Sequence, residues 1–345
     1  MTTSDPPAIR VSSPADLIEA VPYLLGFHPA ESLVVIGFDG AEAVTRQITV
    51  TARLDIGPDG ADPVGLRSLV QVLGRSDSGA VAAVLLTDRL AGDPRRQPWL
   101  TDIMSALVAE LASVELPLLD ALAATGSRWW SLCCAQLDCC PPEGRPRSSA
   151  SSTVAAEATF AGLVALPDRQ ALLASLDGAS VSVRAALLPA LRRADHRFAE
   201  LAARDGLRRT RRGERAAVLR AAGECQAGLR LSPRRLARLG VALRDVEIRD
   251  AIWLGVDDRS LNAEELLGQL HSRLPPPYLT APLFLFGWQL WRSGSGTLAA
   301  MAAERALQSD PEYSAARLLL EAVEAGMDPR STPPLAGGRT NRLPV

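Results

Sequence analysis

Four cysteines gathered within eight residues are the most distinctive chemical feature of the sequence. Two adjacent pairs, Cys133–Cys134 and Cys139–Cys140, are separated by four residues. Thiolates brought together by a short turn can bind a soft metal ion such as zinc, although about two to four residues usually separate the members of a zinc-binding pair. Adjacent side chains usually point to different faces, so three of the four thiols could meet. Cys134, Cys139 and Cys140 are the candidate metal ligands, with Cys225 or a histidine needed to complete the site.

Two other interpretations of these cysteines stay open. Free cysteine is often a small buried hydrophobic residue, and the paired spacing should hold neighbouring thiols apart, so we expect no stoichiometric metal. Reversible thiol oxidation is the remaining interpretation. In that case Cys134 and Cys139, at either end of a short turn, should react first, and they become candidate catalytic nucleophiles.

Two further residues are candidate catalytic groups. His28 lies between the first predicted helix and the first predicted strand, where it could act as a base or a ligand. Such a histidine more often satisfies a local hydrogen bond. Asp88 follows an apolar run, and carboxylates beyond strand ends line ligand crevices in open α/β sheets. A capping or turn role for Asp88 is the more common alternative.

The composition excludes several enzyme classes. All 37 basic residues are arginine, so the chain offers no lysine for a Schiff base, a pyridoxal anchor, a Walker phosphate loop or a Ser-x-x-Lys hydrolase. The Gly-x-Gly-x-x-Gly, Gly-x-Ser-x-Gly and His-Glu-x-x-His motifs are also absent from the sequence. The sequence therefore identifies neither a reaction nor a cofactor.

Positive charge is concentrated in one segment, although the whole chain carries a net charge of only -2. Residues 184–249 hold 17 arginines against seven acids. Such segregation is typical of a nucleic-acid or partner surface, and the densest cluster supplies the candidates Arg208, Arg209, Arg211 and Arg212. The alternative is that these arginines coat alanine-rich helices and pair with carboxylates of the acidic first domain.

We expect two domains to position these residues, because a chain of 345 residues exceeds the usual size of a single domain. Residues 10–140 predict an α/β domain with a mixed, layered sheet, in the order helix, two strands, helix, strand, helix, two strands. The first helix should begin after Ser13 and stop near Pro22. The runs 32–38 and 80–86 are continuously apolar, as in buried strands.

The rest of the chain predicts an all-α domain. Residues 141–152 are rich in proline and serine and should form a linker or loop. Residues 153–326 show helical spacing throughout, and the proline-rich tail 327–345 should be disordered. The amino terminus lacks the features of a signal peptide, and the longest apolar stretch, 278–291, is too short to span a membrane. We therefore expect a cytoplasmic protein, in which thiols stay reduced.

Several segments resemble the signatures of an uncharacterised actinobacterial family, domain of unknown function 4192. The resemblance covers about residues 10 to 328 and rests on segments 21–29 with 32–37, 129–144, 246–253, 281–291 and 306–313. Because that family has no established activity, the resemblance implies no catalytic residues. We expect a noncatalytic regulatory or interaction protein with a protein partner and no membrane association. A thiol-dependent enzyme or metal- or redox-responsive protein, and a nucleic-acid-binding protein, are the alternatives.

Overall fold

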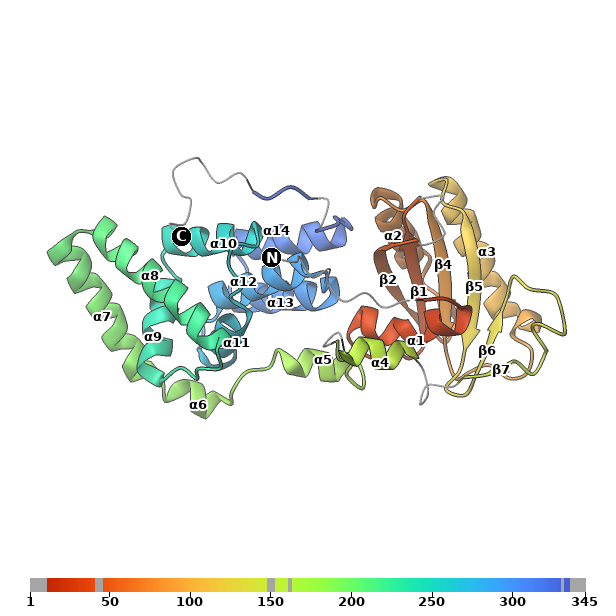
Figure 1. Cartoon of the computed structure of the whole chain (residues 1–345), viewed down its shortest axis with the longest axis horizontal. Coiled ribbons are helices and arrows are strands. Elements are labelled where there is room, and N and C mark those ends of the chain that lie inside the picture. The colour runs from red at the N-terminus through yellow and green to blue at the C-terminus, as the bar shows by residue number, and fades with distance from the viewer. Residues whose placement is uncertain (1–10, 41–45, 148–152, 161–162, 330–331, 336–345) are drawn as a thin grey trace. The chain divides into compact units, whose positions relative to one another are not determined.

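The computed structural model divides the chain into two compact units. It describes residues 11–40, 46–147, 153–160, 163–329 and 332–335. The first unit comprises Met1–Leu172 with Ala325–Asp328, and the second comprises Leu173–Glu324 with Pro329–Val345. A mixed sheet with helices forms the first unit and helices alone form the described part of the second, which confirms the predicted fold class (Figure 1).

The first unit is built on a seven-stranded sheet in the order β3-β2-β1-β4-β5-β6-β7. The strands are β1 (Ser32–Phe38), β2 (Ile48–Gly57), β3 (Gly60–Ala61), β4 (Ala80–Leu86), β5 (Leu118–Ala124), β6 (Arg128–Ser131) and β7 (Arg145–Pro146). β4 and β5 are parallel, while the other neighbouring pairs are antiparallel. The predicted mixed sheet therefore has its parallel pair at the centre.

The helices of the first unit are α1 (Pro14–Leu25), α2 (Pro63–Arg75), the short 3-10 helix η1 (Pro94–Arg96), α3 (Pro98–Ser113) and α4 (Thr153–Phe160), while the division between the units falls within α5 (Arg169–Ser175). Leucines of α2 and α3 pack on alternate residues of β1, β4 and β5 to form one core. The intervening residues of β1 and β4 are also buried, and α1 contacts β5 and α4. Burial on both faces explains why these two strands are continuously apolar.

The predicted end of the first helix is wrong. α1 continues through Pro22 to Leu25 and ends at Gly26, whose φ of 81° is the left-handed conformation of a helix C-cap. A proline removes one backbone hydrogen bond, but Val21 and Leu25 continue the buried face beyond the first turns. Packing of that face holds the last turn in place.

The helices of the second unit are α6 (Val181–Ala185), α7 (Leu188–Asp205), α8 (Leu207–Gln226), α9 (Pro233–Ala242), α10 (Val246–Asp257), α11 (Glu264–Arg273), α12 (Thr280–Arg292), α13 (Gly296–Ser309) and α14 (Ser314–Glu324). Its aromatic core joins α10 to α12: Trp253 meets Phe284 and Trp288 edge to face, with ring centroids 4.8 and 4.9 Å apart. The apolar stretch 278–291 thus forms most of a buried helix. None of the helices in the described ranges has the length and apolar character of a membrane span.

The division between the units lies at Leu172, beyond the linker predicted at 141–152. α4 contacts α1, which groups it with the sheet and not with the later helices. Residues 148–152 and 336–345, within the predicted linker and tail, lie outside the described residues. In the described part of that tail, the backbone oxygens of Pro329 and Thr332 accept hydrogen bonds from Arg292 at 2.7 and 2.8 Å. That the two domains separate at the linker stays a prediction.

Candidate functional site

Residues 132–144, which connect β6 to β7 and which we call the thiol loop, carry the cysteine cluster. The loop begins where Leu132 donates its backbone N–H to Ala121 of β5, at 2.7 Å. Near its other end the loop contacts Trp130 of β6, whose indole N–H donates to the Pro142 carbonyl at 3.0 Å. Gly144 adopts a φ of 77°, and a Cβ there would lie 2.4 Å from the Trp130 ring. Both ends of the loop are therefore fixed to the sheet.

Three of the four thiols converge inside this loop. The sulfur atoms of Cys134, Cys139 and Cys140 all lie within 4.8 Å of one another. The turn before the second pair is tight, because the backbone N–H groups of Cys139 and Cys140 both donate to the Gln136 carbonyl, at 3.2 and 2.7 Å. Cys140 is buried, Cys134 is half-buried and Cys139 is exposed. Burial as small hydrophobic residues therefore describes Cys140 but not the whole cluster.

Two arginines hold the backbone around the converging thiols. Arg95 of η1 donates to the carbonyl oxygens of Cys134 at 2.9 Å and Cys140 at 3.3 Å. It is itself held by Asp93, whose carboxylate lies 2.9 Å from its Nε. Arg145 donates to the Cys139 carbonyl at 2.6 Å, and one of its terminal nitrogens lies 4.0 Å from the Cys139 sulfur. Sequence reasoning missed both arginines, although Asp93–Pro94, directly before Arg95, is a turn-forming pair that could have drawn attention to this position.

The thiols differ in acidity because their surroundings differ. A hydrogen bond from the Gln136 backbone N–H lowers the pKa of Cys134, with a smaller contribution from the Arg95 charge. Burial raises the pKa of Cys140 to about 11. Three thiolates at this separation can bind one soft metal ion, which would keep one position of a tetrahedron for another ligand. Among the described residues, no histidine or carboxylate joins the three sulfurs in this cluster.

The other predicted residues lie elsewhere. His28 is exposed after α1, and its backbone N–H donates to the Leu166 carbonyl at 2.9 Å. Cys225 is buried in α8 of the second unit, and the exposed Cys133 lies outside the converging group. The structure therefore does not bring His28, Cys133 or Cys225 into the cluster of three sulfurs.

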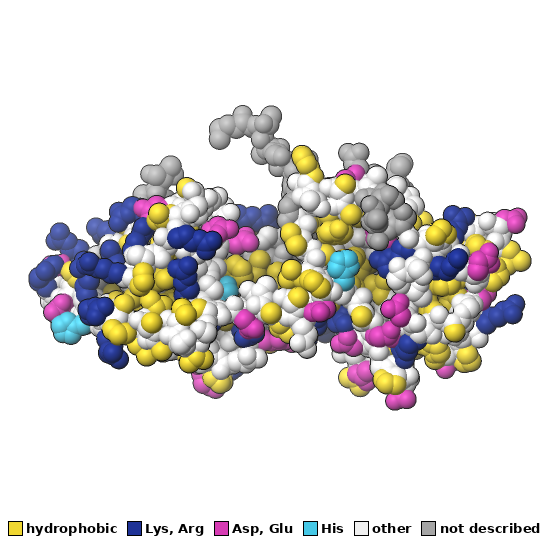
Figure 2. Space-filling model, turned by 90° about the horizontal axis from the view of Figure 1, so that it is seen from below, with side chains coloured by type: hydrophobic (Ala, Val, Ile, Leu, Met, Phe, Trp, Pro, Cys, Tyr) yellow, Lys and Arg dark blue, Asp and Glu magenta, His cyan; other side chains and the backbone are white. Residues whose placement is uncertain are grey.

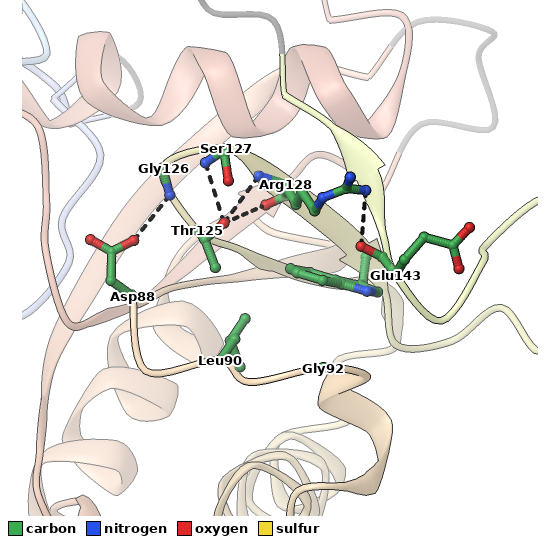
Figure 3. A pocket seen from close by; sticks show the side chains of 9 residues that line it. Asp88, Leu90, Gly92, Thr125, Gly126, Ser127, Arg128 and Glu143 are labelled. Atoms are coloured by element: carbon green, nitrogen blue, oxygen red, sulfur yellow. Dashed lines mark hydrogen bonds between the residues drawn. The ribbon is translucent and has the colours of Figure 1, made fainter.

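Asp88 lies at the rim of a cavity of about 580 Å³ beyond the carboxyl ends of β4 and β5 (Figure 3). One of its carboxylate oxygens accepts the Gly126 backbone N–H at 3.0 Å and so stabilises the turn after β5. The opposite wall of the cavity contains Trp130, which belongs to β6, and Glu143, which belongs to the thiol loop. Arg128 donates to the Glu143 and Gly144 carbonyls at 3.1 and 2.8 Å. The end of the thiol loop is thus a wall of this cavity.

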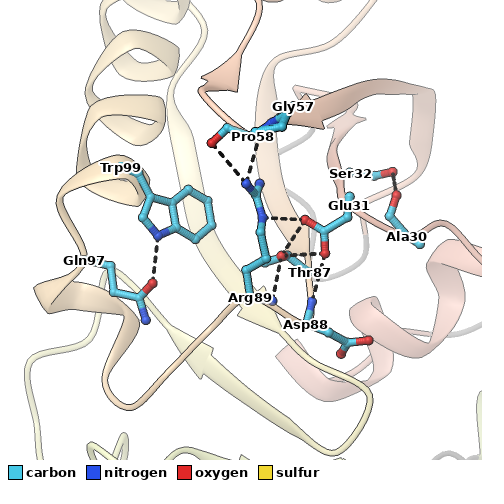
Figure 4. A network of polar contacts seen from close by, with 10 residues as sticks. All are labelled: Ala30, Glu31, Ser32, Gly57, Pro58, Thr87, Asp88, Arg89, Gln97 and Trp99. Atoms are coloured by element: carbon cyan, nitrogen blue, oxygen red, sulfur yellow. Dashed lines mark hydrogen bonds and ion pairs between the residues drawn. The ribbon is translucent and has the colours of Figure 1, made fainter.

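A polar network beside Asp88 fastens the start of β1 to the end of β4 (Figure 4). Glu31 adopts a φ of 43°, which is uncommon for a residue with a Cβ. Its carboxylate accepts the Thr87 hydroxyl at 2.8 Å and pairs with Arg89 at 2.7 Å. The Arg89 guanidinium lies over the Trp99 ring, 4.8 Å from its centroid. Both carboxylate oxygens and the backbone carbonyl of Glu31 have partners inside the unit, which gives the network a structural role.

The four candidate arginines of the second unit fall into two kinds. Arg208, Arg209 and Arg212 are exposed on α8. Arg211 faces the neighbouring helix α10, where it pairs with Asp245 at 2.9 Å and with Glu247. The alternative of pairing within the chain therefore applies to Arg211, although the partners are in its own unit and not in the acidic first domain.

Comparisons with known proteins add one finding. Searches of curated proteins and of solved structures gave no match. A family model described as "Domain of unknown function (DUF4192)" matches residues 14–330, nearly the whole chain and close to the range of the resemblance found in the sequence. The chain therefore belongs to the domain of unknown function 4192 family.

Proposed function

We propose that the chain is a noncatalytic regulatory protein that reversibly binds one zinc ion through Cys134, Cys139 and Cys140. The convergence of these three sulfur atoms carries the proposal. Zinc–thiolate bonds of about 2.3 Å in a tetrahedron separate the sulfurs by about 3.8 Å. The sulfur atoms, which lie within 4.8 Å of one another, therefore need to approach by only about 1 Å to reach the bound geometry.

The charges around the loop support binding of a metal by thiolates. One zinc ion with three thiolates carries a net charge of about −1. The guanidinium of Arg95 contacts the backbone at two of the three cysteines, and that of Arg145 lies beside the third. Positive groups and N–H donors outside the ligand set stabilise bound thiolates and hold them in place.

Access to solvent supports regulation over a permanent structural role. Cys139 is exposed and Cys134 is half-buried, so an ion can enter and leave without unfolding the sheet. A site with three protein ligands can also take a small molecule at its fourth position. Both properties suit a response to changing zinc concentration. The proposal requires a reducing compartment such as the cytoplasm, where the thiols remain free.

Zinc titration of the full chain, purified under reducing conditions without a histidine tag, tests the proposal. We expect about one zinc per chain by elemental analysis. Cys139→Ser should abolish binding with little change in folding, because this side chain is exposed. Cys133→Ser is the matched control and should keep the ion, since Cys133 lies outside the converging group.

Equal loss of zinc in both variants would contradict the proposed ligand set. Absence of zinc from the unaltered, folded and reduced chain would contradict the function itself. A zinc-free chain in which two of the three thiols have become a disulfide would favour reversible thiol oxidation in its place.

A further inference from the structure

The carboxylates of α7 and α8 are already engaged with neighbouring groups. Glu214 of α8 is buried and pairs with Arg238 of α9 at 2.8 Å, and Glu224 pairs with Arg235. On α7, Asp195 accepts the Tyr278 hydroxyl, Glu200 lies 3.2 Å from His196, and Asp205 pairs with Arg204 at 2.9 Å. Each of these acids therefore lies beside a partner in the same unit, which for Glu200 is a histidine that carries charge only when protonated.

Six arginines on the same two helices keep their charge exposed. All six are exposed to solvent, and none makes a hydrogen bond or an ion pair with another described residue; they are Arg192, Arg193, Arg197, Arg208, Arg209 and Arg212. The hydrogen bond from Arg204 lowers the pKa of Asp205, and the nearby charge of Arg209 adds a smaller contribution. Figure 2 shows arginine side chains, in dark blue, gathered over the part of the second unit that α7 and α8 form, at the left of the view. The positive charge of these six arginines is therefore only weakly compensated by neighbouring carboxylates.

The helical geometry groups these arginines. α7 and α8 contact each other and are joined at Gly206, which makes them a helical hairpin. Arg208, Arg209 and Arg212 fall within an arc of about 100° on α8. The 18 residues of α7 extend over about 27 Å, a length that covers about eight phosphates of one strand in a nucleic-acid duplex.

We propose that the α7–α8 hairpin binds the phosphate backbone of double-stranded nucleic acid without reading its base sequence. Guanidinium groups match phosphate oxygens in charge and in bidentate geometry. Protein interfaces are typically anchored by buried aromatic residues, whereas α7 and α8 contain neither tryptophan nor tyrosine, and their one phenylalanine, Phe198, is already half-buried. α9 supplies no base-reading helix, because six of its ten residues are buried.

The dependence of binding on salt tests the proposal in the full chain. We expect a labelled DNA duplex of about 30 base pairs to bind with a log–log salt slope of about −4, if about four arginines contact phosphates. Substituting Arg208, Arg209 and Arg212 together by glutamine should reduce the magnitude of the slope by about 2 to 3. The same triple substitution at Arg46, Arg75 and Arg169, exposed in the first unit, changes the net charge equally and should leave the slope unchanged.

A second comparison lies within α8 itself. Arg212→Gln should reduce the magnitude of the log–log salt slope by about 1, because it removes one exposed charge. Arg211→Gln should leave the slope unaltered while lowering the melting temperature, because Arg211 is engaged with Asp245 and Glu247. Binding that ignores salt, or that falls equally in the two triple variants, would overturn the proposal. So would tighter binding to polyglutamate than to the duplex, which would assign the surface to an acidic protein.

Discussion

Replacing Asp257 by asparagine should destabilise the second unit through one buried charge. The side chains of Asp257 and Arg292 are 0% and 5% exposed, and their charged atoms lie 2.6 Å apart. The same carboxylate accepts the Trp288 indole N–H at 2.9 Å and the backbone N–H of Leu335. Asp257→Asn has nearly the same shape but leaves the guanidinium buried without its counter-charge. Such a loss costs about 3 to 5 kcal/mol of unfolding free energy.

Urea unfolding followed by tryptophan fluorescence measures this loss, since Trp288 contacts the altered group. With a denaturant slope of about 2 kcal/mol per molar, the midpoint should fall by about 2 M. Replacing the pair together, as Asp257→Leu with Arg292→Met, should recover much of the loss because no buried charge remains. A fall of less than about 0.5 M in Asp257→Asn would refute the reasoning, because it would show that water or other groups already satisfy Arg292.

Three further predictions concern other groups. Burial lowers the pKa of His271 from 6.5 to about 4, so the unfolded chain binds the extra proton first as pH falls. The free energy of unfolding that is present above pH 6.5 should therefore decrease by about 3 kcal/mol towards pH 4. Urea titrations at several pH values should show a weaker pH dependence in His271→Leu. Gly144→Ala should lower stability by about 2 kcal/mol, measured by thermal unfolding, because of its φ of 77° and the contact with Trp130. Mass spectrometry after alkylation of the native, metal-free chain should find Cys139 modified and Cys140 modified only after denaturation, because only the first is exposed.

The sequence predicts an element well where local pattern and tertiary surroundings agree. The runs 32–38 and 80–86 became β1 and β4 with the same bounds, because strands covered on both faces are apolar at every position. β3 and β7 have two residues each and were not predicted, since their pairing depends on neighbours that lie outside any local pattern. α1 passed Pro22 because the buried face of the helix continued beyond it.

The arginine-rich segment shows what composition alone cannot distinguish. Arg211 and Arg212 are adjacent in a run of similar residues, and the sequence predicts the same role for both. One turns towards the N-terminus of α10 and its carboxylates, while the other faces solvent. On a helix the direction of a side chain changes by about 100° per residue, so the packing of α8 against α10 decides which charges remain exposed.

The cysteine cluster depends on both local and distant structure. The expectation that adjacent thiols diverge holds for an extended strand, in which successive side chains alternate between faces. Cys139 and Cys140 instead end a turn in which both N–H groups reach one carbonyl, and both sulfurs lie near that of Cys134. Arg95 reaches the same loop from a segment about 40 residues earlier, carried there by the polypeptide that follows β4. The spacing of the cysteines could therefore suggest which thiols meet, but only the folded structure places the Arg95 guanidinium against the carbonyl oxygens of Cys134 and Cys140.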